Sequence, residues 1–443
     1  MNALRINSRT LCAIPLWVAL TLVTGPSAHA AGNFYQQHNL VADLAGVADH
    51  ADSNLVNAWG VAFNPFGPVW VANSGTGTST LYDGKGTVSP LVVQIPTPTS
   101  LTGGNPTGIV YNGSSGFVVS SGGISGASRF IFATEDGVIA GWASSVDQTH
   151  AIRVIDNSAS TGAVYKGLAL GAGGNGSLLY AADFHNNRID VFDGTFKPVT
   201  LSTGAFSDPS LPPGFAPFGL QTINGNLYVS YAMQDDAKHD DVKGDGLGYV
   251  NVFGPNGELV KRVVSAGKLN APWGMALASA GFGKFANRLL VGNFGDGKIN
   301  AYDLASGEFV GQLSGANDSP IQIDGLWGLA FGNGFANQPV NTLFFAAGPG
   351  GEQQGLYGRI DMVAGEPSTE CLLDWAEKTY PSLFPKADGP TVTVSVYTAR
   401  HYTGTNSYLG ISSVDNHVYY KSKDGQLQDE GPVSFWLPQA GCQ

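Results

Sequence analysis

The sequence predicts an all-β fold, a β-propeller with six blades, followed by a small α+β module. A glycine-centred strand motif recurs six times at intervals of 48 to 59 residues, close to what a four-stranded blade with its loops needs. The 443-residue chain has 61 glycines and 11% aromatic residues, which favours short strands joined by tight turns. Long helical periodicity is nearly absent, which argues against a helical solenoid.

Each copy of the motif is expected to open one blade. Further strand signals follow it, such as Val69–Asn73 and Thr80–Gly84 in the first repeat. Ile189 and Val191 alternate with polar neighbours, the period-2 pattern of a half-buried strand. The six copies are Ala58–Ala62, Pro106–Val110, Tyr165–Ala169, Pro217–Gln221, Pro272–Ala276 and Leu326–Ala330.

The second repeat leaves two registers open. Its second strand is either Phe117–Ser120, or Phe130–Glu135 with residues 112–128 as an insertion. We favour the second register because Gly137–Trp142 then matches the third strand of the other repeats.

Residues 1–30 have the pattern of a secretory signal peptide. Arg5 and Arg9 precede the apolar stretch Leu11–Val23, and Ala28–Ala30 is an A-x-A cleavage site. An uncut N-terminal anchor is the alternative. We therefore expect a secreted or periplasmic protein whose mature chain has no membrane span.

The net charge of the chain argues against some classes of binding partner. The net charge is −12, and removing Arg5 and Arg9 with the signal makes it −14. Such an acidic chain is a poor match for nucleic acid or for an anionic membrane surface. The expected partner is a small molecule, a glycan or a protein, and the expected state is a monomer.

The repeat pattern ends after Met362, so we expect a propeller over residues 31–363 and a separate module over residues 364–443. Cys371 and Cys442 are the two cysteines left after the signal, and we expect a disulfide between them in an oxidising compartment. The module's expected elements are a helix at Cys371–Tyr380 and strands at Thr391–Tyr397, Tyr408–Ser412 and His417–Tyr420.

Four aromatic or cationic side chains of this module leave two interpretations open. They form either an aromatic binding face or the ordinary core of a small domain. The four are Arg400, Tyr402, Tyr408 and Trp436.

Two sets of oxygen-bearing side chains are candidate calcium ligands. One set follows the second strands of different repeats, where a propeller brings loops together near its axis, and oxygen ligands suit Ca²⁺. The other lies in an insertion in the fourth repeat, which does not fit an EF-hand because Lys243 stands at its third position. Turn formation and a solvated acidic loop are the alternatives. The sets are Asn73, Glu135, Asp183 and Asn293, and Asp235, Asp236, Asp240, Asp241 and Asp245.

The residue before the motif glycine is aromatic in four repeats, as Trp59, Phe218, Trp273 and Trp327. These rings either wedge between blades or form a stacking platform for a sugar or an aromatic ligand. His185, in a loop on the same predicted face, is a further candidate for ligand contact, with a solvated loop histidine as the alternative.

Several segments resemble known families. Ala182–Phe192 resembles the strand–turn–strand signature of NHL-repeat propellers. Asn54–Ala62 and Phe130–Gly137 are typical of an uncharacterised family of exported bacterial propellers, a resemblance that covers residues 33–363. The C-terminal segment resembles a Cys-bounded module of other exported bacterial proteins. These resemblances imply fold and export, but no activity.

A further resemblance concerns the first oxygen set. It is similar to the metal ligands of calcium-dependent propeller lactonases, although the acidic residue of their first inner strand is missing here. H-E-x-x-H, C-x-x-C and G-x-S-x-G motifs are also absent from the sequence. The leading hypothesis is therefore an exported binding or scaffold protein stabilised by Ca²⁺. The alternatives are a metal-dependent, lactonase-like hydrolase or lyase acting at one propeller face, and an extracellular surface or matrix interaction protein.

Overall fold

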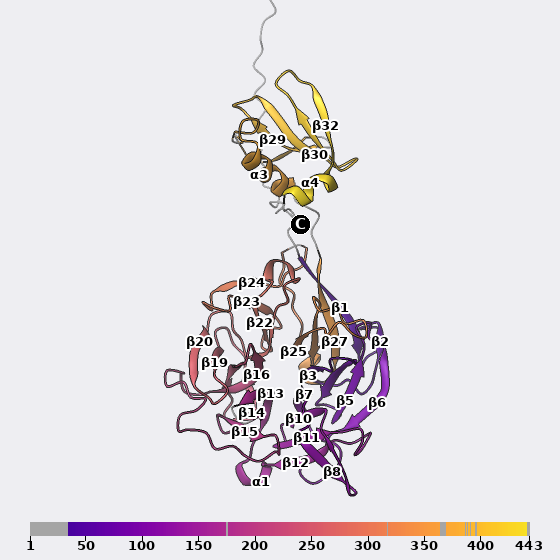
Figure 1. The fold of residues 1–443 in the computed structure, drawn as a ribbon, viewed down its shortest axis with the longest axis vertical. Coiled ribbons are helices and arrows are strands. Elements are labelled where there is room, and N and C mark those ends of the chain that lie inside the picture. The colour runs from indigo at the N-terminus through magenta and orange to yellow at the C-terminus, as the bar shows by residue number, and fades with distance from the viewer. Residues whose placement is uncertain are drawn as a thin grey trace, which may run out of the picture. The chain divides into compact units, whose positions relative to one another are not determined.

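The computed structural model describes residues 34–173, 176–316, 318–363, 369–385, 387, 389, 391–394 and 397–440. The chain divides into two compact units, one before and one after residues 367–368 (Figure 1). The predicted signal peptide, residues 1–30, lies outside the described residues. Within the described ranges, no helix is both long and apolar enough to cross a membrane.

The larger unit is mostly β-strand and has a β-propeller-like fold built from antiparallel sheets. Six of these sheets each begin with a strand that carries one copy of the motif. The first three sheets consist of β3 (Ala58–Phe63), β4 (Val69–Asn73), β5 (Thr78–Tyr82) and β6 (Val88–Gln94), then β7 (Pro106–Tyr111), β10 (Phe130–Thr134), β11 (Val138–Trp142) and β12 (Ile152–Asp156), then β13 (Tyr165–Gly173), β14 (Gly176–Asp183) and β15 (Arg188–Asp193).

Three more sheets follow the same plan. The fourth consists of β16 (Phe215–Ile223), β17 (Asn226–Gln234), β19 (Tyr249–Phe253) and β20 (Leu259–Ser265), with β18 (Asp241–Val242) beside β17. The fifth consists of β21 (Pro272–Leu277), β22 (Leu289–Asn293), β23 (Ile299–Tyr302) and β24 (Phe309–Gln312), and the sixth of β25 (Leu326–Phe331), β26 (Leu343–Ala347), β27 (Leu356–Val363), β1 (Phe34–Ala42) and β2 (His50–Ala51). Short helical turns lie in the connections, namely α1 (Ser158–Thr161), η1 (Gly283–Phe285) and α2 (Pro349–Glu352).

The motif glycines let the innermost strands approach one another. The innermost strands of consecutive sheets lie side by side, and β25 lies beside β3. A Cβ atom at Gly219 would meet the carbonyl oxygen of Trp273 at 2.0 Å, and one at Gly328 would meet that of Trp59 at 2.5 Å. Each of the six motif glycines meets the backbone of the next innermost strand in this way. The repeated glycine is therefore required by close backbone contact.

The N-terminal strand completes the last sheet. β1 pairs antiparallel with β27, with Phe34 opposite Val363 and Ala42 opposite Leu356. Figure 1 shows this pairing as an indigo strand beside an orange one. The glycine motif does not predict a strand at residues 34–42, because it marks innermost strands and β1 lies near the outer edge of its sheet.

The second sheet confirms the favoured register of the second repeat. β10 pairs with β7, while β8 (Val118–Ser121) and β9 (Ile124–Ala127) form a separate hairpin in the predicted insertion. One detail of the prediction was wrong. Thr134 lies opposite Pro106, as Asn73 lies opposite Ala58, so Thr134 holds the position that we had assigned to Glu135.

Apolar side chains fill the space between neighbouring sheets. Between the first two, Trp70 stacks on Phe130 with 4.1 Å between ring centroids and contacts Trp142 at 4.7 Å. Similar clusters form between other neighbouring sheets. The sheets are thus held together mainly by buried apolar area.

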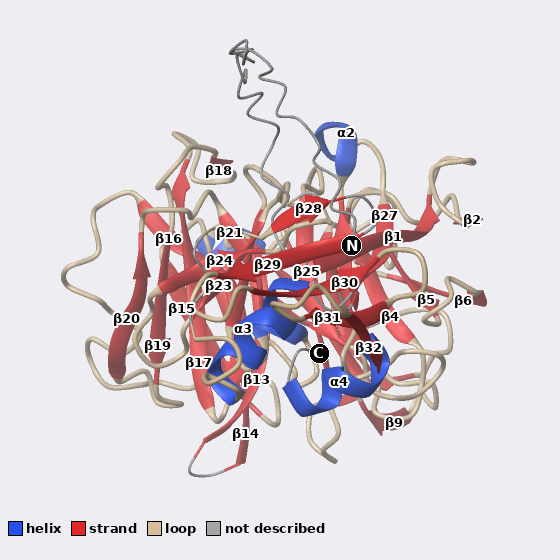
Figure 2. Ribbon diagram, turned by 90° about the horizontal axis from the view of Figure 1, so that it is seen from above, coloured by secondary structure: helices blue, strands red, loops and turns tan. Residues whose placement is uncertain are grey.

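The smaller unit combines helices and one antiparallel sheet, shown in blue and red in Figure 2. The predicted helix and the last two predicted strands are confirmed, but the first predicted strand was wrong because the structure has two strands there. The prediction also missed the last strand and helix. The elements are α3 (Thr369–Thr379), β28 (Val392–Val394), β29 (Tyr397–Tyr402), β30 (Ser407–Ser412), β31 (His417–Lys421), β32 (Leu427–Pro432) and α4 (Val433–Ala440).

The residues that the sequence singled out in this unit lie in different environments. Tyr402 is fully buried in the core, and Arg400 pairs with Asp374 at 2.5 Å and Glu377 at 3.0 Å. Cys371 lies in α3, but Cys442 lies outside the described residues. The disulfide between them therefore stays a prediction.

Candidate functional site

The aromatic residues before the motif glycines gather in one cluster. The rings of Trp59 and Trp327 stack with 3.4 Å between centroids, and Trp273 meets them edge-on at 5.7 and 5.8 Å. All four aromatic residues of the predicted stacking platform are buried in this structure, so their contact with a ligand stays a prediction. We call this group the aromatic cluster: Trp59, Phe184, Ala216, Phe218, Ala232, Ala271, Trp273, Phe294 and Trp327.

The aromatic cluster contains unpaired hydrogen-bond donors. Within the described residues, the indole N–H groups of Trp59, Trp273 and Trp327 are buried and have no hydrogen-bond partner. A cavity of about 40 Å³ among the innermost strands is lined by Trp273 and by motif glycines such as Gly60 and Gly274. Buried polar groups are normally paired, so this concentration of unpaired donors is unusual.

Lys166 is the charged residue among the six that precede the motif glycines, and Thr107 is the other residue there that is not aromatic. Its position carries tryptophan or phenylalanine in four of the other five repeats. The Lys166 side chain is only 2% exposed. Its Nζ atom lies 5.3 Å from the ring centroid of Trp59 and 5.9 Å from that of Phe184. These rings stabilise the ammonium by cation–π attraction, but a buried charge also needs anionic partners.

Two carboxylates pair with the Lys166 ammonium. Nζ of Lys166 donates to Oε1 of Glu135, which follows β10, and at 3.2 Å to Oδ1 of Asp240, which comes from the acidic insertion. Burial opposes protonation of Lys166, but the two carboxylates outweigh this effect, and the pKa of Lys166 is raised. The lysine therefore stays charged.

More carboxyl groups surround this ion pair. Burial raises the pKa of Asp136 and Glu352, and it raises the pKa of Asp241 to about 7. Repulsion by Glu135 adds to the shifts of Asp136 and Glu352. We call the whole group the carboxyl cluster: Glu135, Asp136, Asp240, Asp241 and Glu352.

The acidic insertion is shaped by its own hydrogen bonds. Oδ1 of Asp235 accepts from the main-chain N–H of His239 at 2.8 Å. β18 pairs with the end of β17 and contains Asp241. The insertion thus delivers Asp240 and Asp241 to the carboxyl cluster. Asp236 and Asp245 are exposed.

The four residues of the first predicted set of calcium ligands each form hydrogen bonds with different partners. Asn73 donates to two threonine hydroxyls on β5, at 3.1 and 2.9 Å. Asp183 accepts from Nδ2 of Asn186 at 2.7 Å, and Asn293 donates to a main-chain carbonyl at 2.8 Å. His185, on the loop after β14, is half-buried. Within this set, only Glu135 contacts Lys166.

One group in the described residues has the spacing of metal ligands. Glu135, His239 and Asp240 each offer a ligand atom, and these atoms lie within 4.8 Å of one another. Carboxylates and imidazole together suit a divalent cation. Because Lys166 already pairs with both carboxylates, a metal ion here would have to share or displace the ammonium.

The comparisons place the chain among viral relatives. It is 34% identical over 330 residues to the uncharacterized protein R648 of Acanthamoeba polyphaga mimivirus, which covers 72% of this chain and 78% of the relative. The chain belongs to the R648 family. Protein L690 of the same virus is 35% identical to it over 299 residues, which is 66% of this chain and 77% of L690. No family model matches the chain.

Two solved structures give distant matches to this member of the R648 family. A streptogramin B lyase structure matches with a TM-score of 0.45 and 12% identity, over 76% of this chain and 100% of that one. A Bacteroides thetaiotaomicron protein of unknown function matches with a TM-score of 0.46 and 12% identity, over 74% and 76%. Export of this chain stays a prediction.

Sequence reasoning missed Lys166, Asp136 and Glu352 of this site in the R648-family chain. Lys166 had a visible signal, because aligning the six motifs places it among aromatic residues. Glu352 had none. It lies in α2, and its contact with the site is a hydrogen bond from Nδ2 of Asn57, 295 residues earlier, to Oε2 at 2.8 Å.

The raised pKa of Asp241 predicts a pH effect on stability. The folded chain keeps this proton up to about pH 7, whereas an ordinary aspartate releases it near 3.8. The free energy of unfolding therefore falls as pH rises between these values. Asp241→Asn should remove this fall, so that the variant gains on the order of 2 kcal/mol relative to wild type between pH 5 and pH 8. Urea denaturation across this pH range measures the gain.

The control for this pH effect is Asp245→Asn, in the same insertion but at an exposed position. Its stability should follow that of the wild type at every pH. If the free energies of unfolding of the wild type and Asp241→Asn change in parallel between pH 5 and pH 8, Asp241 does not titrate in this pH range.

Proposed function

We propose that the chain is an exported six-bladed β-propeller that acts as a binding protein, with a cation, Ca²⁺ in particular, as the ligand of its carboxyl cluster. The observation that carries this proposal is a cluster of five carboxyl groups, two of which pair with the one buried ammonium of Lys166. A ligand that brings positive charge would relieve the repulsion among them.

The blade count rests on the sheets of the larger unit. Six sheets each open with one motif copy, and the innermost strands of the first and last sheets, β3 and β25, lie side by side. We interpret each sheet as one blade and the N-terminal strand as the closure of the sixth. Such closure leaves few open sheet edges.

The chemistry of the carboxyl cluster favours a hard cation. Lys166 uses one oxygen of Glu135 and one of Asp240, which leaves the second oxygen of each carboxylate. Oδ2 of Asp241 and Oδ1 of Asn57 are buried without a hydrogen-bond partner in the described part of the chain. Carboxylate and amide oxygens are the ligands that Ca²⁺ prefers.

Thermal unfolding with calcium or with EDTA tests this proposal. If Ca²⁺ binds the folded chain, millimolar Ca²⁺ should raise the melting temperature by a few degrees, and EDTA should reverse the rise. Glu352→Gln should reduce the rise, because it removes a carboxylate of the cluster.

Glu308→Gln is the matched control, since it makes the same change at an exposed position before β24. It should respond to Ca²⁺ as the wild type does. An unchanged melting temperature in the wild type, or an equal response in Glu352→Gln, would argue against the cation site.

A second function has one specific observation in its favour. The spacing of Glu135, His239 and Asp240 suits a divalent metal ion, and such an ion can activate water for hydrolysis. The alternative is therefore a metal-dependent hydrolase or lyase acting at this end of the innermost strands. Turnover of lactone, ester or glycoside substrates that depends on added metal and is lost in Glu135→Gln would favour it over the binding protein.

A further inference from the structure

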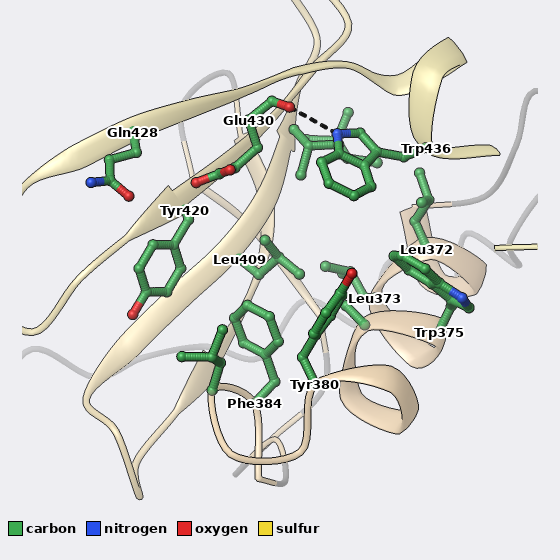
Figure 3. A pocket seen from close by; sticks show the side chains of 14 residues that line it. Leu372, Leu373, Trp375, Tyr380, Phe384, Leu409, Tyr420, Gln428, Glu430 and Trp436 are labelled. Atoms are coloured by element: carbon green, nitrogen blue, oxygen red, sulfur yellow. Dashed lines mark hydrogen bonds between the residues drawn. The ribbon is translucent and has the colours of Figure 1, made fainter. Parts of the chain in front are cut away.

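The C-terminal unit contains an apolar cavity that the carboxyl cluster does not explain. The cavity has a volume of about 280 Å³ and is lined by residues of α3, the strands β30–β32 and α4. Figure 3 shows the side chains that line it. Ligand pockets in proteins usually measure about 300–1,000 Å³. A cavity of this volume fits a compound with one or two rings.

Aromatic side chains form much of its wall. Trp375 and Trp436 lie with 6.1 Å between ring centroids, and Phe384 and Tyr420 with 5.8 Å. In Figure 3, Leu409 lies between these two pairs. Facing aromatic and aliphatic groups favour a flat apolar ligand by burial and ring contact.

The position of Trp436 is fixed by a hydrogen bond. Its indole Nε1 donates to the main-chain carbonyl of Glu430 at 2.9 Å. This bond links α4 to β32. The cavity wall is therefore held by a polar contact as well as by packing, which is a property of a preformed site.

The residues that line the cavity also indicate which ligand charge it favours. Glu430 and Gln428, both on β32, are its only strongly polar side chains apart from the Tyr380 and Tyr420 hydroxyls, and no lysine, arginine or histidine is among the lining residues in the described part of the unit. An anionic ligand would meet the Glu430 carboxylate without a compensating cation. A cationic or neutral ligand avoids this repulsion.

Some of the apolar side chains that line the cavity are also exposed to solvent. Tyr380 is 40% exposed and Leu383 is 50% exposed, and both line it. Large apolar side chains at a concave opening are typical of a binding surface. We propose that this cavity is a binding site for a small aromatic compound that is neutral or carries a positive charge, such as an aromatic amine.

Three indole compounds that differ in charge test the proposal. The full chain is titrated with tryptamine, indole and indole-3-acetate by isothermal titration calorimetry at pH 7.5. Tryptamine should bind at least several-fold more tightly than indole-3-acetate, with indole in between. Glu430→Gln should remove most of the difference between tryptamine and indole-3-acetate.

A pair of arginine substitutions localises the binding. Leu383→Arg places a cation at the cavity opening and should weaken tryptamine binding at least several-fold. Val414→Arg makes a comparable change in the turn after β30, where the side chain is 75% exposed, and should bind tryptamine as the wild type does. Equal melting temperatures of the two variants show that both are folded.

The results that overturn the proposal are definite. Absence of binding of all three compounds at millimolar concentration would mean that the cavity is not a ligand site. Equal tryptamine affinity in Leu383→Arg and Val414→Arg would place binding elsewhere. Tighter binding of indole-3-acetate than of tryptamine would contradict the charge argument. None of these results depends on Ca²⁺, so they are separable from the test of the carboxyl cluster.

Discussion

Lys166→Met is expected to lower the free energy of unfolding by about 3–5 kcal/mol, the usual cost of removing one partner of a buried ion pair. The substitution leaves Glu135, whose side chain is 14% exposed, beside the aromatic cluster without a cation. Methionine has nearly the length of lysine and packs well on aromatic rings. The loss would therefore come from charge rather than from a cavity. Urea denaturation at pH 7.5 measures it.

Two further variants separate the ion pair from general damage. Lys166→Met combined with Glu135→Gln removes both charges and should recover much of the loss. Lys243→Met is the matched control, because Lys243 is exposed and its Nζ lies 3.9 Å from the ring centroid of Phe294. It should cost less than about 1 kcal/mol. If Lys166→Met is as stable as the wild type, the buried pair does not stabilise the fold.

Gly219→Ala is expected to have a comparable or larger effect, a loss of more than about 4 kcal/mol or failure to fold. Its Cβ atom would lie 2.0 Å from the carbonyl oxygen of Trp273, a main-chain atom of the next innermost strand. Relief of this overlap requires two sheets to move apart. Soluble yield and thermal melting of the purified variant measure the effect.

Gly113→Ala provides the control. The nearest atom to a Cβ there is in the Tyr111 ring, at 3.5 Å, an ordinary contact distance. This variant should fold and melt close to the wild type. A normal melting temperature for Gly219→Ala would mean that the innermost strands are not as tightly packed as the geometry indicates.

The repeating part of the fold was predictable because its cause is local and periodic. Every innermost strand needs a glycine where the next strand's backbone approaches, so the requirement appears in the sequence six times. β1 was not predictable in this way. Its partner β27 lies more than 300 residues away, and the outer part of a sheet lacks the close contact that selects glycine.

The site was predicted in fragments. Glu135, Asp240 and Asp241 were proposed from two separate patterns, and the propeller-like fold brings them together near Lys166. The error of one residue at Thr134 had a physical consequence, since neighbouring strand residues point to opposite faces. Glu135 stands at the position of Phe184 and Phe294, which belong to the aromatic cluster.

The pairing of β1 with β27 also sets an order for biosynthesis. The sixth sheet receives strands from both ends of residues 34–363, so its contacts become complete only when residue 363 has left the ribosome. Until then, β1 lacks its partner β27, and the side of β26 that β27 will cover stays open. Unpaired strands readily associate with other chains. The interval between synthesis of the first and the last strand is therefore when this protein most needs protection from aggregation.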